Sequence, residues 1–334
     1  MVTLVTGASG FVGSHVIDTL LAQGRAVRAL VRNPTAAEEL RDRGVEVQVG
    51  DVREAHVLTQ AARGVDVIYH CAAAVGPAFS PREIHDIGLS GARHVLEALR
   101  QAGAGRAVLL TSVNVLGTRH LADATEDLPC RRSGDASADV KIEIEALAHE
   151  YEQRHGVDAT ILRPGLIYGP RDRHNLPQMI RALRRGRFAY IGSRDHVTPI
   201  VHVSDVVQAI LLAGRTPASR GRAYHITDGS RTTIGDFIDH LAGLLGCPAP
   251  RKVLPYMVPA MGCFVFETLA RTRLYRGRPP INRSSLRHLG TSRFFSIARA
   301  SKELGYTPHI SFQEGLNTTV KWIEEHAHGH ATVT

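Results

Sequence analysis

The feature that most restricts the fold of this chain is a glycine-rich segment close to its first residue. A strand is predicted over 2–6, Thr6-Gly7-Ala8-Ser9-Gly10-Phe11-Val12-Gly13 follows it, and a helical pattern fills 11–23. In such a unit the first glycine permits a tight turn, the second lets the backbone approach a pyrophosphate, and the third lets the helix pack against the sheet. The phosphates would lie at the helix amino terminus, where free N–H groups and the helix dipole favour an anion. The pattern predicts a dinucleotide site that contains Gly7, Ser9, Gly10, Phe11, Val12 and Gly13.

Short apolar strands and helical patterns alternate through the first half of the chain. Strands are predicted at 2–6, 26–32, 45–50, 66–73, 106–112 and 158–164. Helices are predicted at 11–23, 35–43, 54–63, 82–103 and 138–155. Alternating strands and helices with tight turns indicate an α/β fold of the Rossmann type, a doubly wound parallel sheet with helices on both faces. We expect this nucleotide-binding domain to cover 1–165.

The pattern of elements changes after Pro164. Helices are predicted at about 175–185 and 204–214, with a short strand at Phe188–Ile191 between them, and 233–290 mixes helix with Pro and Gly breaks. We expect a smaller, mixed substrate-binding domain over 166–325, from which some elements return to pack on the first sheet. Within it, 253–290 carries apolar and aromatic residues together with arginines. We predict that this segment is a lid over a flat polycyclic ligand; the alternative is a core helix followed by a solvated basic loop.

The composition is that of an ordinary soluble globular protein. The 334 residues are 43% hydrophobic and 22% charged, which excludes long disorder. The four cysteines lie far apart without metal-ligand spacing, so we expect reduced thiols, a cytoplasmic location and no metal site. The longest apolar run, 253–266, is too short to span a bilayer and is broken by prolines. The net charge of +8 comes from dispersed arginines without a recognition motif, so we expect neither a membrane nor a nucleic acid as a partner.

The end of the second strand favours NADP(H) over NAD(H). An acidic residue at this place would bind a ribose 2′-hydroxyl, but the chain has Arg32 followed by Asn33. A guanidinium can bind a 2′-phosphate through paired hydrogen bonds, although a solvated surface arginine is the alternative. We therefore expect an NADP(H) site over 1–165, which also accepts NAD(H). Asp51 and Val52, after the third strand, would flank the adenine.

With these and further motifs, the chain resembles the extended short-chain dehydrogenase/reductase family. That family includes NAD(P)-dependent sugar epimerases and dehydratases and enzymes similar to dihydroflavonol reductase. The motifs span nearly the whole chain: the glycine-rich start, Gly50-Asp51-Val52, His70-Cys71-Ala72-Ala73, 161–170, 201–206 and 301–306. The resemblance implies a Rossmann fold and cofactor contacts from Ala72, Ala73, Ala74, Pro164 and Leu166.

The resemblance also implies a catalytic serine and a Tyr-x-x-x-Lys pair. In the family, the tyrosine gives or takes the carbonyl proton, the lysine lowers the tyrosine pKa and binds the nicotinamide ribose, and the serine holds the substrate oxygen. Ser112 occupies the serine position and Lys141, one of only four lysines, occupies the lysine position, but the tyrosine position holds Ser137. Gly88 stands where many relatives have asparagine. Asn114 is a further candidate, because its amide could donate a hydrogen bond to the substrate.

A serine is a poor replacement for a tyrosine as an acid. The pKa of its hydroxyl lies far above that of a phenol, which is about 10, and its side chain is shorter. An ill-matched acid forfeits part of the roughly 10²–10⁴-fold that proton transfer supplies. No register shift brings in another tyrosine, since the nearest are Tyr151 and Tyr168. We interpret His202 as structural, before a helix capped by Ser204 or Asp205.

Three functions remain open. The first is an NADPH-dependent ketoreductase whose substrate has a phenol beside its carbonyl, so that an internal hydrogen bond polarises the ketone and the phenol or water supplies the proton. In this respect the chain is similar to atypical ketoreductases that act on angucyclinones, which are polycyclic aromatic ketones of antibiotic biosynthesis. The second function is a sugar-nucleotide epimerase or dehydratase, which Ser137 disfavours. The third is a non-catalytic NADP-binding regulator, which the retained Ser112 and Lys141 disfavour. The family implies a monomer or a homodimer.

Overall fold

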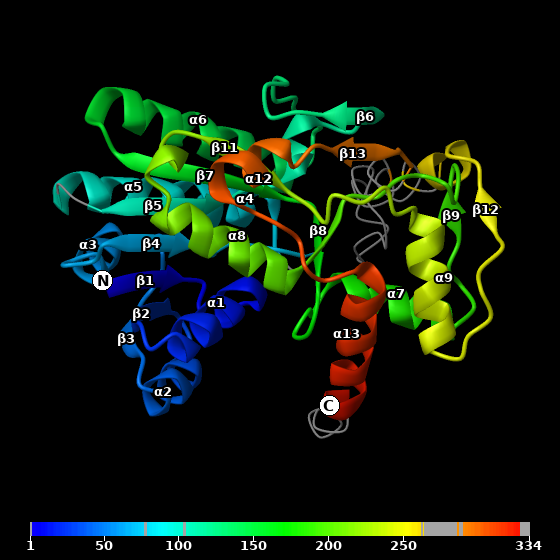
Figure 1. Cartoon of the computed structure of the whole chain (residues 1–334), viewed down its shortest axis with the longest axis horizontal. Helices are drawn as coiled ribbons and strands as arrows, with labels where there is room; N and C mark the ends of the chain where they lie inside the picture. Colours follow the sequence, from blue (N-terminus) through cyan, green and yellow to red (C-terminus); the bar gives the residue numbers. More distant parts are fainter. Residues whose placement is uncertain are drawn as a thin grey trace, which may run out of the picture.

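The computed structural model describes residues 2–76, 79–102, 105–261, 263, 286 and 290–327. Within them, seven parallel strands form one large sheet in the order β11-β7-β5-β4-β1-β2-β3 (Figure 1). These strands are β1 (Val2–Thr6), β2 (Ala26–Val31), β3 (Glu46–Val49), β4 (Val67–His70), β5 (Arg106–Leu110), β7 (Asp158–Pro164) and β11 (Ala223–Ile226). The prediction of a doubly wound parallel sheet is confirmed.

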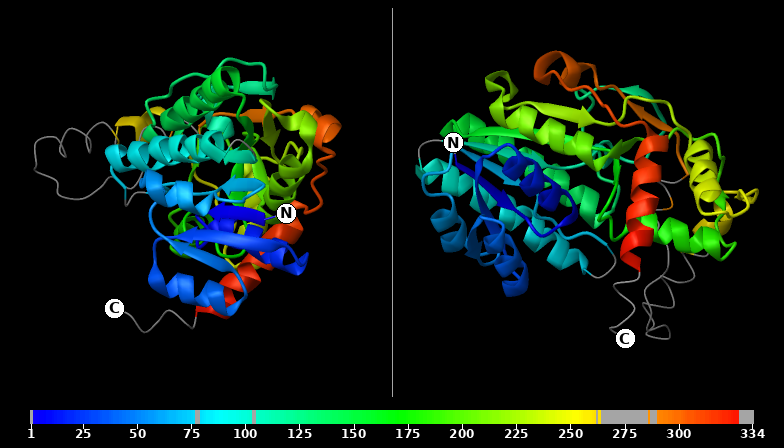
Figure 2. Two further views of the ribbon diagram at one scale, coloured as in Figure 1. Left: turned by 90° about the vertical axis from the view of Figure 1, so that its left-hand side faces the viewer. Right: turned by 60° about the horizontal axis from the view of Figure 1, so that its bottom comes forward.

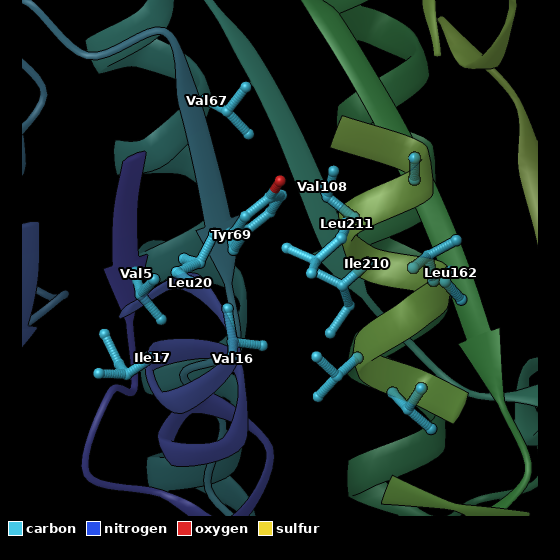
Figure 3. Packing of buried hydrophobic residues seen from close by; sticks show 14 of the residues in the cluster. Val5, Val16, Ile17, Leu20, Val67, Tyr69, Val108, Leu162, Ile210 and Leu211 are labelled. Atoms are coloured by element: carbon cyan, nitrogen blue, oxygen red, sulfur yellow. The ribbon is translucent and has the colours of Figure 1, made fainter. Parts of the chain in front are cut away.

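Helices cover both faces of this sheet. One face carries α1 (Phe11–Ala22), α2 (Pro34–Asp42), α8 (Val203–Arg215) and α12 (Ala298–Leu304). Figure 3 shows this packing, with Val16, Ile17 and Leu20 of α1 and Ile210 of α8 directed towards the strands. The other face carries α3 (Ala55–Ala61), α5 (Gly91–Ala102) and α6 (Ala136–His155). Because both faces are covered, the central strands are mainly apolar, as the apolar runs in the sequence predict.

A second group of elements lies beyond the carboxyl ends of the strands (Figures 1 and 2). It contains α7 (Asn175–Arg184), α9 (Ile234–Leu244), α13 (Phe312–Ala327) and the paired short strands β8 (Leu166–Tyr168) with β10 (Ile200–His202) and β9 (Tyr190–Ile191) with β12 (Val253–Leu254). Its core is centred on Phe237, Leu241 and Leu316. The elements α8, β11 and α12 come from the same half of the chain but pack on the large sheet.

The structure corrects the predicted helix over 82–103. It divides into α4 (Pro81–His85), a π-helical turn (Asp86–Ser90) and α5. The strand predicted at Phe188–Ile191 is confined to β9.

Other short strands have no counterpart in the prediction, among them β11 and the pair β6 (Leu121–Ala124) and β13 (Arg293–Phe295). Strands of three or four residues are too short to show a clear alternation of apolar and polar residues. Of the predicted lid, only 253–261, 263, 286 and 290 belong to the described residues.

Candidate functional site

The glycine-rich turn lies where the order of the strands reverses. β2 and β3 follow β1 on one side and β4 lies on the other, so the carboxyl ends of β1 and β4 border the crevice in which such sheets bind ligands. Gly7 has φ +67°, and an added Cβ would lie 2.7 Å from the backbone nitrogen of Ala72. An added Cβ at Gly13 would lie 2.2 Å from the carbonyl oxygen of Gly7. Only glycine fits at these two positions.

The amino terminus of α1 is prepared for an anion. Its N-cap, Gly10, contributes no side-chain hydrogen bond, and no acidic residue occupies the first turn. The first N–H groups of a helix have no partner inside it, and the helix dipole adds partial positive charge. This bare turn fits the pyrophosphate of a dinucleotide, which binds through such N–H groups.

Arg32 and Asn33 follow the carboxyl end of β2, beside Asp51 and Val52. Arg32 follows β2, its side chain is 59% exposed, and one guanidinium nitrogen lies 3.8 Å from the Asp51 carboxylate. Asp51 is mainly bound by Arg53, whose Nε and terminal nitrogen donate to it at 3.0 and 2.9 Å and lower its pKa. Asn33 caps α2 by accepting from Thr35 N, and Val52 is buried. The exposed guanidinium of Arg32 is compatible with a 2′-phosphate.

The other side of the crevice begins after β4. Ala74 is buried and Ala73 is exposed in the segment that faces the glycine-rich turn. Thr6 Oγ1 and His70 Nδ1 lie 2.8 Å apart and join β1 to β4. Burial lowers the pKa of His70 to about 4, so this ring is neutral and supports the strands.

Pro164 and Leu166 continue this edge from β7 into β8. Between them, Gly165 N donates to Ile226 O, and an added Cβ at Gly165 would lie 2.3 Å from Pro199 O. The backbone here is closely surrounded on both sides, which fixes the course of the chain past the carboxyl end of β7.

Ser112 and Asn114 lie on the loop after β5. Ser112 is 8% exposed and begins a 3₁₀ turn over Val113–Leu116. Its Oγ accepts a hydrogen bond from Asn114 N at 3.2 Å. The side-chain oxygen of Asn114 accepts from Arg293 of β13 at 2.9 Å. The two candidate side chains are therefore neighbours on one loop.

One face of α6 is turned towards the carboxyl ends of β5 and β7. Ser137, Lys141 and Glu145 follow one another at intervals of four residues, which places them on the same side of the helix. Glu145 accepts from Thr111 Oγ1 at 2.7 Å and from Arg163 of β7 at 2.6 Å. These buried contacts fix the orientation of the face that carries Lys141 and Ser137.

Burial lowers the pKa of Lys141, whereas the carboxylates of Asp135 and Glu145 raise it. Asp135 caps α6 by accepting from Ala138 N at 2.9 Å. Lys141 is half-buried on this face of α6, and its ammonium can donate to a hydroxyl-rich group such as a ribose.

Gly88 lies in the π-helical turn, and local packing accounts for its small size. An added Cβ would lie 3.3 Å from Val140 Cγ2 and 3.7 Å from Ile144 Cδ1, both on α6. A larger side chain at this position would require the Val140 side chain to shift by a few tenths of an ångström. The two positions that differ from the family pattern, Gly88 and Ser137, therefore lie on two elements that pack together, the π-helical turn and α6.

The two tyrosines nearest to Lys141 in the sequence are engaged elsewhere. Tyr151 lies ten residues after Lys141 on α6 and donates to Glu97 of α5 at 3.4 Å. Tyr168 is 2% exposed, packs against His202 and Phe237, and has its pKa raised by burial. Tyr275 lies outside the described residues.

His202 is structural, but the expected cap of the following helix is wrong. His202 itself is the N-cap of α8, because its Nδ1 accepts from Ser204 N at 3.3 Å. Burial lowers its pKa to about 4. Asp205 instead accepts from the backbone nitrogens of His309 and Ile310.

Sequence reasoning misses Arg293, Glu145 and Arg163. Glu145 has a signal, since it stands one helical turn after Lys141 on the same face. Arg293 has none, because it is separated from Asn114 by 179 positions and lies on a strand of three residues.

Comparison with known proteins identifies the family. Residues 3–227 match the model of the NAD dependent epimerase/dehydratase family. The chain is 31% identical over 321 residues to the 4-hydroxy-2-methyl-3-oxo-4-farnesyl-3,4-dihydroquinoline-1-oxide ketoreductase of Stigmatella aurantiaca, covering 95% of each chain. It is 27% identical over 327 residues to the human decarboxylating sterol-4-alpha-carboxylate 3-dehydrogenase, covering 95% of this chain and 87% of the other.

A solved structure agrees with this assignment. A double mutant of the dTDP-glucose 4,6-dehydratase DesIV from Streptomyces venezuelae, solved with NAD bound, has a TM-score of 0.78 and 25% identity and covers 98% of both chains. Among the helices described here, none has the length and apolarity needed to cross a bilayer. In the same part of the chain, no group of three or more His, Cys, Asp or Glu residues is arranged to hold a metal ion. The chain belongs to the NAD dependent epimerase/dehydratase family, among the extended short-chain dehydrogenases/reductases, and is an NAD(P)-dependent oxidoreductase.

Proposed function

We propose that this protein is an NADPH-dependent ketoreductase that reduces a ketone on a flat aromatic polyketide of the angucyclinone type in antibiotic biosynthesis. The observation that carries the proposal is the combination of Ser112 and Lys141 with Ser137 at the tyrosine position. The chain keeps groups that can hold a ketone oxygen and a ribose, but it lacks the phenol. The named activity of the Stigmatella aurantiaca relative, on a 3-oxo-dihydroquinoline, supports reduction of a ring ketone.

NADP(H) is the preferred cofactor in this proposal, and NAD(H) is also accepted. The pyrophosphate lies on the turn that contains Gly7, Ser9, Gly10, Phe11, Val12 and Gly13, with the 2′-phosphate on Arg32 and Asn33 and the adenine beside Asp51 and Val52. The nicotinamide half contacts Ala72, Ala73, Ala74, Lys141, Pro164 and Leu166. When bound, the cofactor supplies the hydride that reduces the ketone carbon.

The residues of the chain then have the task of holding the ketone oxygen. Ser112 Oγ accepts from Asn114 N, so its own O–H can donate to the ketone oxygen. The phenol beside the ketone, or a water molecule, supplies the proton in place of a tyrosine.

We predict from the sequence that the segment 253–290 covers the substrate; of this segment the structure describes only 253–261, 263, 286 and 290. Met257, Val258 and Met261 of this segment are 66%, 54% and 66% exposed, a larger apolar surface than isolated exposed side chains give. Such a surface fits a flat aromatic ring system. The free thiols of Cys71, Cys130 and Cys247 support a reducing, cytoplasmic location, and we place the enzyme there as a monomer or homodimer.

A turnover assay with NADPH tests this function. The panel contains a tetracyclic aromatic polyketide ketone, an aliphatic ketone and a nucleotide sugar, the last because the likeness to the DesIV structure favours a sugar-nucleotide enzyme as the second candidate. Oxidation of NADPH with the aromatic ketone, and not with the aliphatic one, is the expected result. Conversion of the nucleotide sugar without ketone reduction would replace the proposal with the epimerase/dehydratase function.

A further inference from the structure

A buried arginine lies behind the loop that carries Ser112. Arg293 is 5% exposed. In the described part of the chain, its guanidinium makes a single hydrogen bond, to the side-chain oxygen of Asn114 at 2.9 Å, and its Nε is buried without a partner. Burial lowers its pKa to about 10, so it stays protonated at neutral pH. A buried cation without an ion-pair partner is costly to keep, which points to a role beyond packing.

The position of Arg293 is fixed by its strand. Its backbone nitrogen donates to Val197 O at 2.9 Å, and β13 pairs with β6 through Arg293 and Leu121. The centre of the guanidinium lies 6.0 Å from the centroid of the Phe295 ring. The side chain therefore approaches Asn114 from a rigid element.

The contact fixes the orientation of the Asn114 amide. A guanidinium can only donate, so the amide oxygen must face Arg293 and the amide nitrogen must face away from it. Among the described residues, this nitrogen donates to no partner. The backbone nitrogen of the same residue donates to Ser112 Oγ, which leaves the O–H of Ser112 directed elsewhere. Two donors from neighbouring side chains are thus available on one loop, and the positive charge behind them has no ion-pair partner among the described residues.

We propose that Ser112 Oγ and Asn114 Nδ2 together bind the oxygen of the substrate ketone, and that Arg293 is a positioning residue that orients and polarises Asn114. The inference rests on the proposed ketoreductase function. The hydride adds to the carbonyl carbon, the π electron pair of the C=O bond moves to the oxygen, and this alkoxide takes a proton from the neighbouring phenol or water, leaving NADP⁺. Donors that are in place before the reaction stabilise the negative charge on that oxygen. They supply the electrostatic part of what the absent tyrosine would do.

Asn114→Asp tests the donor without breaking the contact to Arg293. The carboxylate still accepts from the guanidinium, and now as an ion pair, but it has no N–H to offer. We expect kcat to fall by ~10²–10³-fold, as loss of one such donor does elsewhere, while the melting temperature and the Kd for NADPH stay within error of the wild type. A kcat within threefold of the wild type overturns the role of Asn114.

Arg293→Ala and the double variant Arg293→Ala/Asn114→Ala test the role of the arginine. Arg293→Ala should lose most of the wild-type kcat and regain part of it when millimolar guanidinium is added. The kcat of Arg293→Lys should lie between those of Arg293→Ala and the wild type. Because Arg293 acts through Asn114, its loss should change kcat little once Asn114 is alanine. Additive losses in the double variant contradict the inference.

Arg231→Ala is the matched control. Arg231 lies over the Phe294 ring at 4.0 Å and donates to Ala122 O, so it also joins β13 to β6 but does not reach Asn114. We expect this variant to keep the kcat of the wild type. An equal loss in Arg231→Ala shows that the effect of Arg293 comes from the strand pair.

Binding of 8-hydroxy-1-tetralone in the presence of NADP⁺ separates this inference from the proposed function. If the wild type reduces no ketone, the proposed function fails. The inference still predicts that Asn114→Asp weakens binding of this hydroxyketone by ~10-fold or more, the worth of a well-made hydrogen bond. Equal binding by the wild type and the variant overturns it.

Discussion

At the residue scale, the proposed function depends on Ser137. It lies one helical turn before Lys141 on the face of α6 that the Glu145 contacts turn towards β5 and β7. Its hydroxyl is too weak an acid to do the work of a phenol near neutral pH. We therefore propose that the substrate or water supplies the proton and that donors on the loop after β5 bind the ketone oxygen.

Ser137→Ala should change the reaction little. We expect kcat with an aromatic hydroxyketone to stay above about one third of the wild-type value, because proton transfer at this position is not part of the rate gain. The measurement is initial-rate NADPH oxidation at saturating substrate. Loss of all turnover in a folded variant that still binds NADPH would identify Ser137 as the acid.

Arg32→Ala should remove the preference for NADPH. The exposed guanidinium would bind the 2′-phosphate through charged hydrogen bonds, and one such bond contributes about 1.5–3 kcal/mol to the binding free energy. In the wild type, NADPH should raise the melting temperature more than NADH at equal concentration, and the two shifts should become similar in the variant. Arg100→Ala, which breaks an exposed pair with Glu97 on α5, is the control. Equal shifts in the wild type contradict the role of Arg32.

At the element scale, the turn between β1 and α1 and the contacts around α6 hold the site together. The conformation of the turn requires close approach of the backbone at Gly7 and Gly13, and the glycine spacing in the sequence predicts this. The orientation of α6 is set by Glu145, Thr111 and Arg163, which come from three elements. Spacing along one helix indicates the face that carries Lys141, but the partners across the sheet appear only in the fold.

Gly13→Ala should damage the turn between β1 and α1. An added Cβ would lie 2.2 Å from Gly7 O, so the helix must move, which costs about 1–3 kcal/mol and removes cofactor binding. Gly243→Ala in α9 is the opposite case, because no atom lies within 4 Å of the added Cβ. This variant should raise the free energy of unfolding by about 0.5–1 kcal/mol. Thermal unfolding and titration with NADPH measure both effects. Tight cofactor binding by Gly13→Ala is incompatible with the proposed turn.

Glu145→Ala should destabilise the protein strongly. It leaves Arg163 buried without its carboxylate, a change that costs about 3–5 kcal/mol in other proteins. Urea unfolding measures the loss. Glu150→Ala, which breaks an exposed pair with Arg154 on the same helix, should cost less than about 1 kcal/mol. Similar losses in the two variants would show that the buried pair does not hold α6.

At the scale of the whole molecule, the sequence predicts the large sheet well and the outer elements less well. Alternating apolar strands and helices indicate a parallel sheet because each helix must cover it, and this is what the fold shows. The break of the predicted helix over 82–103 at the π-helical turn Asp86–Ser90 has no signal in the local pattern. The pairing of β6 with β13, and with it the approach of Arg293 to Asn114, joins segments that are far apart in the chain. The sequence therefore predicts the sheet and the glycine-rich turn, but not the contacts between segments that are distant in the chain.

In the proposed function, a hydroxyl on the substrate does the work of the absent tyrosine. The most direct test compares NADPH oxidation with a tetracyclic aromatic hydroxyketone and with its methyl ether, in which the hydroxyl beside the ketone is blocked. We predict turnover of the hydroxyketone and a rate for the ether that is lower by ~10²-fold or more, the size of a lost proton-transfer contribution. Equal rates for the two compounds, or no oxidation of NADPH with either, would contradict it.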